Sequence, residues 1–376
     1  MRSTRAALAA AGLGLALSLA ACGQNAAAPS SSGGGSAAPA ATSGAKVGVI
    51  LPETASSARW EGFDKPLLTQ AMQAAGLQAD IQNAQGDEQK FSTLADSMIT
   101  SQVKVLVIAS ISSESGAAVA AKATAQGIPV IDYDRLNLGG TSDYYVSFDN
   151  VKVGELQGQG LADALKGKQG AQVIEIEGAP TDNNATLFHN GQENVLKPLY
   201  DSGALKLVAS QPIPNWDNQQ GGTTFEQLLT KNGGKVDGVV AANDGLAGAV
   251  IAVLKKKNLA GKVPVTGQDA TVDGLRAVLR GDQCVTVYKP VRDEAEAAAR
   301  LAIAVARGDL DGADDLATGN LRDPVSRRDM KSVLLGATLI KKDLVRTLVT
   351  EGIVKPAELC AGDLAQACAQ QDILGG

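Results

Sequence analysis

From residue 46 onward, short apolar runs alternate with longer segments whose apolar residues recur at helical spacing. The apolar runs predict buried strands over 47–51, 78–82, 103–109, 127–132 and 144–148. The intervening segments predict helices over 58–75, 88–101 and 113–126. Apolar strands that alternate with amphipathic helices are typical of a parallel sheet with right-handed crossovers.

The same alternation begins again after residue 149. Helices are predicted over 150–165, 184–200, 246–256 and 272–279, and 225–229 is predicted to belong to another helix. Strands are predicted over 171–177, 205–210, 236–241 and 263–266. Two successive runs of similar length predict an α/β protein with two doubly wound parallel-sheet lobes. After Cys284 the pattern weakens, and it predicts a helix over 294–307, a loop over 308–323, a strand over 332–335 and a helix over 342–350.

The N-terminus has the order of a secretory signal. Arg2 and Arg5 precede an apolar run that ends in Leu19-Ala20-Ala21-Cys22, which predicts a signal peptide over 1–21. The last four residues resemble the lipobox of bacterial lipoproteins, so we expect Cys22 to be lipidated. Plain secretion with an incidental cysteine is the alternative. Residues 22–45 contain no charged residue and are rich in Ala, Ser and Gly, which predicts a flexible tether.

Charge and cysteine content narrow the class of protein. Removal of the signal leaves 32 basic and 40 acidic residues, a net charge of −8, which argues against a nucleic-acid partner. Cys360 and Cys368 could pair in an oxidising compartment, and Cys284 lies in an apolar run that predicts a buried thiol. A single histidine, His189, is a poor basis for metal binding or histidine-based catalysis, and we expect no metal and no cofactor.

Polar residues follow several of the predicted strands. The stretch from Val130 to Arg135 runs from a buried strand into two carboxylates and a guanidinium, and ligands of open α/β sheets bind at such strand ends. We interpret it as the floor of a ligand cleft, with a surface Asp–Arg pair as the alternative. Similar clusters are Pro52-Glu53-Thr54, Thr181-Asp182-Asn183-Asn184, Asn243-Asp244, Gln268-Asp269 and Lys289, although Asp182, Asn243 and Asp244 could equally be helix caps.

The two tryptophans, Trp60 and Trp216, each lie beside polar residues and not inside an apolar run. An indole ring packs on the C–H face of a pyranose, while carboxylates, amides and cations bind its hydroxyl groups. This combination favours a sugar ligand. The alternative is that both rings are packing residues.

At this point the chain resembles the D-xylose-binding proteins, the substrate-binding components of ATP-driven sugar importers with the type I periplasmic binding fold. The motifs that carry the resemblance run in order through most of 46–321. They are Asp132-Tyr133-Asp134-Arg135, Ser147-Phe148-Asp149-Asn150, Val153-Gly154-Glu155-Leu156-Gln157, Asp182-Asn183-Asn184-Ala185, Asn243-Asp244, Gly267-Gln268-Asp269 and Thr286-Val287-Tyr288-Lys289-Pro290.

The resemblance implies a sugar held between two lobes that are joined by a three-strand hinge. It places the N-terminal lobe at 46–148 with 288–325 and the C-terminal lobe at 149–287 with 326–376, and it expects the third crossing near 323–333. The sugar-binding residues that it implies are Glu53, Arg59, Trp60, Asp134, Arg135, Asn184, Trp216, Asn243, Asp269 and Lys289. Two departures are Glu53-Thr54, where relatives often carry two acids, and the altered stretch Pro324 to Lys331.

The function predicted from these features is capture of a xylose-like monosaccharide by an exported, lipid-anchored, monomeric binding protein. It would deliver the sugar to the membrane permease of an importer and perform no catalysis. A sugar-sensing lipoprotein is an alternative. An exported carbohydrate-active enzyme with Asp132 and Asp134 as acid and base is another. The first strand is not followed by a dinucleotide-binding fingerprint.

Overall fold

The computed structural model describes residues 44–54, 57 and 59–373. The expected signal peptide at 1–21, the lipidation site Cys22 and nearly all of the tether lie outside these residues. None of the helices in the described part of the chain combines the length and the apolar character that a membrane span requires.

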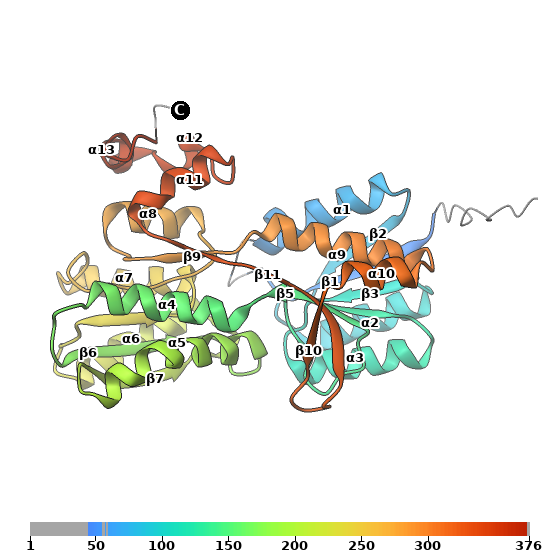
Figure 1. The fold of residues 1–376 in the computed structure, drawn as a ribbon, viewed down its shortest axis with the longest axis horizontal. Coiled ribbons are helices and arrows are strands. Elements are labelled where there is room, and N and C mark those ends of the chain that lie inside the picture. The colour runs from blue at the N-terminus through green and yellow to red at the C-terminus, as the bar shows by residue number, and fades with distance from the viewer. Residues whose placement is uncertain (1–43, 55–56, 58, 374–376) are drawn as a thin grey trace, which may run out of the picture. The chain divides into compact units, whose positions relative to one another are not determined.

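The first lobe is built on a seven-stranded sheet (Figure 1). Its strands, in spatial order, are β10 (Gly319–Arg322), β11 (Asp329–Leu335), β5 (Tyr144–Phe148), β4 (Val130–Tyr133), β3 (Val105–Ile108), β1 (Lys46–Leu51) and β2 (Gln78–Asn83). All neighbours pair in parallel except β10 and β11, which form an antiparallel hairpin. The central strands β1, β3, β4 and β5 are almost wholly buried because helices cover both faces.

Alternation of side chains along the strands divides the core of this lobe into two layers. On one face, Val47 and Val49 pack with α1 (Lys65–Ala74), α9 (Val291–Ala306) and α10 (Leu310–Leu316). On the other face, Ile50 packs with α2 (Glu88–Thr100) and α3 (Ser113–Ala125). The chain returns to the first lobe for α9 and α10 after β9 (Thr286–Tyr288) and then crosses back to the second lobe at β12 (Thr338–Ile340).

The second lobe has a three-stranded parallel sheet in the order β7 (Leu205–Pro212), β6 (Ala171–Glu177) and β8 (Gly238–Ala241). Helices α4 (Asn150–Ala164) and α5 (Asn183–Asp201) cover one face, and α6 (Asn218–Lys231) and α7 (Asp244–Lys256) cover the other. The strand expected over 263–266 contributes only a parallel bridge from Val265 to Val239. The helix to which 225–229 was expected to belong is α6, which begins behind the cap residue Asp217.

Three chain segments pass between the lobes. The first leaves β5 for α4, and its Asp149 amide donates to the Leu335 carbonyl at 2.9 Å. The second leaves β9 (Thr286–Tyr288) for α9, and the third leaves β11 for β12 (Thr338–Ile340), which pairs with β9. The third crossing therefore comes after Leu335, later than the expected stretch 323–333.

The position of β11 corrects the expected lobe boundary at residue 325. β11 pairs along its whole central part with β5, so residues 329–335 belong to the sheet of the first lobe. The preceding segment, expected to be a loop over 308–323, contains α10 and β10. Half-exposed strands and a short helix give weak apolar periodicity, which explains why the sequence pattern did not predict them.

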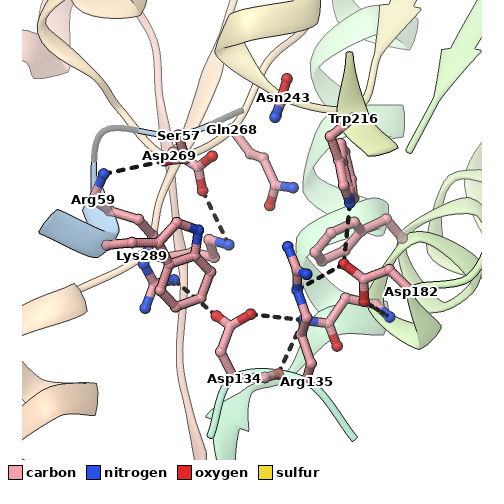
Figure 2. Close-up of a pocket in the computed structure, with 13 residues that line it drawn as sticks. Ser57, Arg59, Asp134, Arg135, Asp182, Trp216, Asn243, Gln268, Asp269 and Lys289 are labelled. Atoms are coloured by element: carbon pink, nitrogen blue, oxygen red, sulfur yellow. Dashed lines mark hydrogen bonds and ion pairs between the residues drawn. The ribbon is translucent and has the colours of Figure 1, made fainter. Parts of the chain in front are cut away.

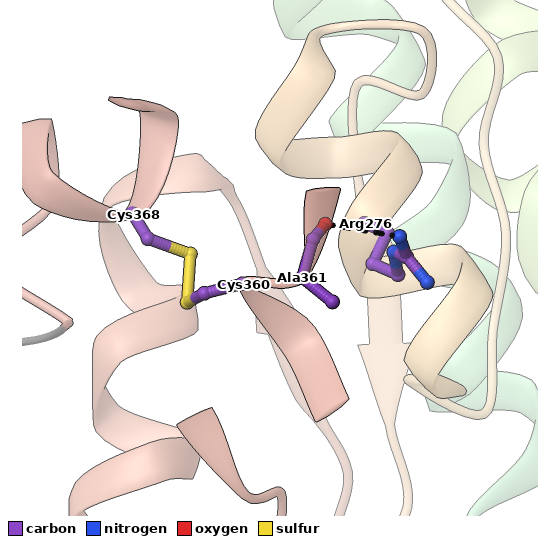
Figure 3. The surroundings of a disulfide bond; sticks show 4 residues. All are labelled: Arg276, Cys360, Ala361 and Cys368. Carbon is purple, nitrogen blue, oxygen red and sulfur yellow. Dashed lines mark hydrogen bonds between the residues drawn. A yellow bond between two sulfur atoms is a disulfide. The ribbon is translucent and has the colours of Figure 1, made fainter. Parts of the chain in front are cut away.

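The C-terminal segment packs against the second lobe. After β12 it forms α11 (Val345–Thr350), α12 (Pro356–Leu359) and α13 (Ala365–Gln370), together with short turns of 3₁₀ helix at Lys342–Leu344 and Gly362–Leu364. Its apolar residues form a cluster with α8 (Val272–Arg280). Cys360 and Cys368 are joined by a disulfide, and the neighbouring Ala361 carbonyl accepts a hydrogen bond from Arg276 of α8 (Figure 3).

Candidate functional site

A polar cavity lies where strand ends and loops of both lobes meet (Figure 2). Its lining residues are Ser57, Arg59, Trp60, Asp134, Arg135, Asp182, Asn184, Phe188, Trp216, Asn243, Gln268, Asp269 and Lys289. Nine of the ten residues expected from the sequence are in this set. The tenth, Glu53, lines an adjoining cavity and accepts a hydrogen bond from the Trp60 indole nitrogen at 2.8 Å.

The first lobe contributes residues from two places. Arg59 and Trp60 lie at the start of the turn of π-helix that precedes α1, and Asp134 and Arg135 follow the last residue of β4. Asp134 has a φ of 62°, a conformation that a residue other than glycine adopts at a cost. This backbone turn presents the carboxylate of Asp134 and the guanidinium of Arg135 side by side at the end of the sheet.

The second lobe contributes the ends of several helices. Asn184 is in the first turn of α5, behind the cap residue Asp182, and Asn243 caps α7. Trp216 ends a 3₁₀ turn, and Asp269 lies in the loop before α8. Trp216 and Asp269 have φ values of 55° and 93°, so three of the cavity's residues have strained backbones. Such residues concentrate at sites where the fold holds a side chain in a required place.

The position of the Trp216 ring requires a glycine at residue 178. A Cβ atom added to Gly178 would lie 2.1 Å from the ring atom Cη2, well inside contact distance. The ring also meets Phe188 edge to face, with centroids 6.4 Å apart, and its nitrogen donates to Asp182 Oδ2 at 3.1 Å. The indole therefore lies in a fixed orientation on the wall of the cavity.

Charged side chains of both signs alternate around the cavity. Three cations, Arg59, Arg135 and Lys289, face three carboxylates, Asp134, Asp182 and Asp269. Arg59 Nη1 bonds Asp134 Oδ2 at 2.8 Å, and Lys289 Nζ lies 3.0 Å from Asp269 Oδ1. Because the charges balance, the lining suits a neutral ligand with many hydroxyl groups better than an ion.

The ionisation of these groups follows from their neighbours. Burial would raise the pKa of Asp134, but the charges of Arg59, Lys289 and Arg135 outweigh it and lower that pKa. Burial would lower the pKa of Lys289, but Asp269 and Asp134 outweigh it and raise that pKa. Both groups are therefore charged at neutral pH and can form charge-assisted hydrogen bonds to hydroxyl groups.

Arg59 is held from behind by carboxylates that do not line the cavity. Its Nε and Nη2 donate to Asp64 at 3.0 and 2.7 Å, and Nη2 also donates to Glu294 Oε2 at 2.6 Å. Burial raises the pKa of Glu294 well above its ordinary value, and the charge of Arg59 opposes this rise. Asp64 also accepts a hydrogen bond from the Tyr133 hydroxyl, which completes a rigid support for the guanidinium.

The lobes also contact each other directly beside the cavity. Asn184 Nδ2 donates to the Asp134 carbonyl at 3.0 Å and to Asp134 Oδ1 at 3.1 Å. Arg135 Nε lies 3.1 Å from Asp182 Oδ2. Gln268 Oε1 is buried without a hydrogen-bond partner in the described chain, so it is available to a ligand.

Some residues that line or support the cavity were not predicted from the sequence. Asp182 and Gln268 were noted as polar residues after strands, but neither was placed in the expected site. Phe188 lies in the middle of α5, where an aromatic residue signals only packing. Asp64 and Glu294 support Arg59 from positions 5 and 235 residues away, and no local motif marks such partners. The lining contains neither histidine nor cysteine and offers no metal site of that kind.

Comparison with known proteins gives one consistent result. Residues 47–310 match the family described as "Periplasmic binding protein domain". The chain is 36% identical over 301 residues to the D-xylose-binding periplasmic protein of Escherichia coli (strain K12), covering 80% of this chain and 88% of that protein. It is 35% identical to the multiple sugar-binding periplasmic protein SbpA of Azospirillum brasilense, with the same two coverages.

Solved structures agree with these matches. A carbohydrate transporter solute-binding protein from Chloroflexus aurantiacus, in complex with D-glucose, superposes with a TM-score of 0.75 at 29% identity. The match covers 83% of this chain and 97% of that chain. The family and the two-lobed fold expected from the sequence motifs are thus confirmed, and the chain belongs to the periplasmic binding protein family with the type I fold.

Proposed function

We propose that this protein is the substrate-binding component of an ATP-driven importer and that it captures a monosaccharide in the cavity between its lobes. The ligand is a xylose-like pentose or a related aldopyranose. One observation carries the proposal: two indole rings from separate lobes line a single buried cavity whose charged groups balance. Indole faces suit the C–H face of a pyranose, and the surrounding carboxylates, amides and cations suit its hydroxyl groups.

The named ligands of the relatives support the same class of substrate. Two matched proteins are named for D-xylose and for multiple sugars, and the superposed structure holds D-glucose. In β-D-xylopyranose and β-D-glucopyranose all ring hydroxyl groups are equatorial, which leaves both ring faces flat. We therefore expect these two sugars to bind more tightly than D-galactose, L-arabinose or D-ribose, each of which has an axial hydroxyl group.

The experiment is calorimetry of the purified protein against these five sugars. Saturable binding of D-xylose or D-glucose at one site per chain is the expected result. No heat and no thermal shift with any of the five sugars would contradict the proposal. Sugar uptake by a strain that lacks the protein then tests its role in import, since a pure sensor leaves uptake intact.

The proposal includes no catalysis. The pair that an enzyme would need, Asp132 and Asp134, does not converge on the cavity. Asp132 is fully buried and accepts hydrogen bonds from the Asn137 amide, the Asn137 side chain and Ser142. This supports a structural role for Asp132, and incubation of purified protein with nitrophenyl glycosides is expected to release no nitrophenol.

The proposal also places the protein at the outer face of the cytoplasmic membrane, anchored through lipidated Cys22 and acting as a monomer. The motif Leu19-Ala20-Ala21-Cys22 supports the anchor. Replacement of Cys22 by alanine is expected to move the protein from the membrane fraction to the soluble fraction, with sugar affinity unchanged. Retention of this variant in the membrane fraction would contradict the anchor without affecting the sugar site.

A further inference from the structure

Outside the sugar cavity, two glutamates and the only histidine of the chain form a cluster inside the second lobe. Glu175 and Glu177 lie two positions apart on β6 and so share one face of the strand, and His189 lies on α5 above them. One ligand atom from each of the three residues lies within 4.8 Å of the other two. His189 Nδ1 is 3.6 Å from Glu177 Oε1.

The two carboxylates are buried, and the imidazole of His189 pairs with Glu177 at 3.6 Å, beyond hydrogen-bond distance. Glu175 is fully buried, and only its Oε1 is satisfied, by a hydrogen bond from the Tyr200 hydroxyl at 2.8 Å. Its Oε2 has no hydrogen-bond partner in the described chain, and neither has His189 Nδ1. An unpartnered oxygen on a buried carboxylate is costly, which calls for a missing partner.

Two buried glutamines show independently that a hydrogen atom or a cation is missing beside Glu177. Gln157 Nε2 donates to three backbone carbonyls, those of Ala241, Ala242 and Gly267, so its Oε1 must face Gln192. In one orientation of the Gln192 amide, Nε2 donates to Gln157 Oε1 at 2.9 Å, and the Gln192 oxygen then lies 2.9 Å from Glu177 Oε1. In the opposite orientation, the Gln192 nitrogen donates to Glu177, and the Gln192 oxygen then lies 2.9 Å from the Gln157 oxygen.

Either orientation therefore leaves two oxygens in contact with no hydrogen between them. A cation beside Glu177 removes this conflict, because a metal ion accepts carboxylate and amide oxygens together. It also gives Glu175 Oε2 and His189 Nδ1 the partner that they lack. A proton on Glu177 is the competing explanation, since it also places a hydrogen between the two oxygens.

We propose that Glu175, Glu177 and His189 bind a divalent transition-metal cation, with the Gln192 carbonyl oxygen as a fourth ligand. Two carboxylates, an amide oxygen and one imidazole suit Zn²⁺ or Mn²⁺ better than the all-oxygen preference of Ca²⁺. Bonds of about 2.1 Å place the ligand atoms of a tetrahedral ion about 3.4 Å apart, so atoms that now lie within 4.8 Å of one another must close by up to about 1.4 Å. The His189 side chain, 37% exposed, gives the ion a route from solvent.

The test uses the full-length protein, stripped with EDTA and titrated with ZnCl₂ or MnCl₂ in calorimetry and in thermal unfolding. We expect one ion per chain and a rise in Tm of several degrees. Glu175→Gln, which keeps the size of the side chain, and His189→Asn are each expected to weaken binding at least about tenfold and to abolish the rise in Tm. Cys284→Ser, which removes the only free thiol of the described chain, is the matched control and is expected to bind as the parent does.

A spectroscopic readout separates the metal from a proton and from loss of folding. Because His189 is the only histidine, the ¹⁵N imidazole resonances of labelled protein report on this residue alone. Saturation with Zn²⁺ is expected to move the Nδ1 resonance at constant pH. An unchanged resonance, the absence of one-to-one binding of either ion, or equal binding by the parent and both variants would each overturn the proposal. The metal test does not depend on sugar binding.

Discussion

The guanidinium of Arg135 from the first lobe and the carboxylate of Asp182 from the second lobe form a buried ion pair, with Nε and Oδ2 3.1 Å apart. The side chains are 9% and 3% exposed. The same oxygen of Asp182 accepts the hydrogen bond from the Trp216 indole. One carboxylate therefore links contact between the lobes to the orientation of a ring on the cavity wall.

The first prediction concerns this carboxylate. Asp182→Asn is expected to lower sugar affinity about 10- to 100-fold, because a buried charge pair loses one partner and the indole loses its anchor. Calorimetry measures the change. Asp201→Asn on the same helix is the control, since it breaks only an exposed pair with Lys197 and is expected to leave affinity unchanged. Equal affinities for Asp182→Asn and the parent would show that the ion pair plays no part in capture.

The two indoles can be tested separately. Trp60→Ala and Trp216→Ala are each expected to reduce sugar affinity at least about tenfold, whereas the phenylalanine variants keep a ring and lose less. Phe63→Ala removes an aromatic ring that is 55% exposed outside the cavity and is expected to have no effect on affinity. If neither alanine variant weakened binding in calorimetry, the sugar would have to bind elsewhere.

The support behind Arg59 makes a prediction about charge. Since burial raises the pKa of Glu294 well above its usual range, the neutral isostere in Glu294→Gln is expected to change the free energy of unfolding by less than about 1 kcal/mol. Glu294→Ala leaves a void beside the guanidinium and is expected to cost about 2–4 kcal/mol. Urea denaturation distinguishes the two variants. A large loss for the glutamine variant would mean that a charged Glu294 is required.

The disulfide is expected to stabilise the C-terminal segment and not the cavity. A loop closed between Cys360 and Cys368 is worth about 2–3 kcal/mol from chain entropy alone. The variant with serine at both positions is therefore expected to unfold at a lower Tm and to lose its C-terminal segment faster to a protease. Its sugar affinity is expected to stay within about twofold of the parent, because no residue after Lys289 lines the cavity. A large loss of affinity would show coupling between the segment and the site.

A pH dependence is expected from Asp244. Burial raises the pKa of this carboxyl group from its ordinary value of 3.8 to about 7. The folded protein therefore holds a proton that the unfolded chain releases. The resulting stabilisation is complete below about pH 4 and is lost as the pH rises through 7, at up to about 1.4 kcal/mol per pH unit.

Asp244→Asn removes the titrating group, so its free energy of unfolding is expected to fall less than that of the parent between pH 5 and pH 7. Other groups titrate in both proteins, so the difference between the two slopes of unfolding free energy against pH reports on Asp244 alone. Asp273→Asn, which removes an exposed carboxylate on α8, is expected to follow the parent. Parallel slopes for Asp244→Asn and the parent would mean that Asp244 is ionised throughout this range.

The sequence predicted what local patterns encode. Apolar runs such as Val105–Ile108 identified the parallel strands, and polar residues after strands identified Asp134, Asn243 and Asp269, which line the cavity. The support of Arg59 by distant segments could not be predicted from the sequence. Glu294 lies in the first turn of α9, where a glutamate is common, and only the fold brings it to Arg59. β10 was not predicted, and β11 was predicted only over 332–335, because the side chains of this hairpin are half exposed and its turn is rich in charge.

The bond between Arg59 and Glu294 joins positions 235 residues apart, with β6, β7 and β8 of the second lobe between them in the chain. The support of the guanidinium therefore stays incomplete, with Asp64 and Asp134 alone, until α9 has been made. A truncated chain that ends before α9 lacks this support even if its first strands pair. The first lobe can therefore complete its folding only after the last third of the polypeptide has been made. Because this contact closes a long loop, the protein is expected to become able to bind sugar more slowly than either sheet forms.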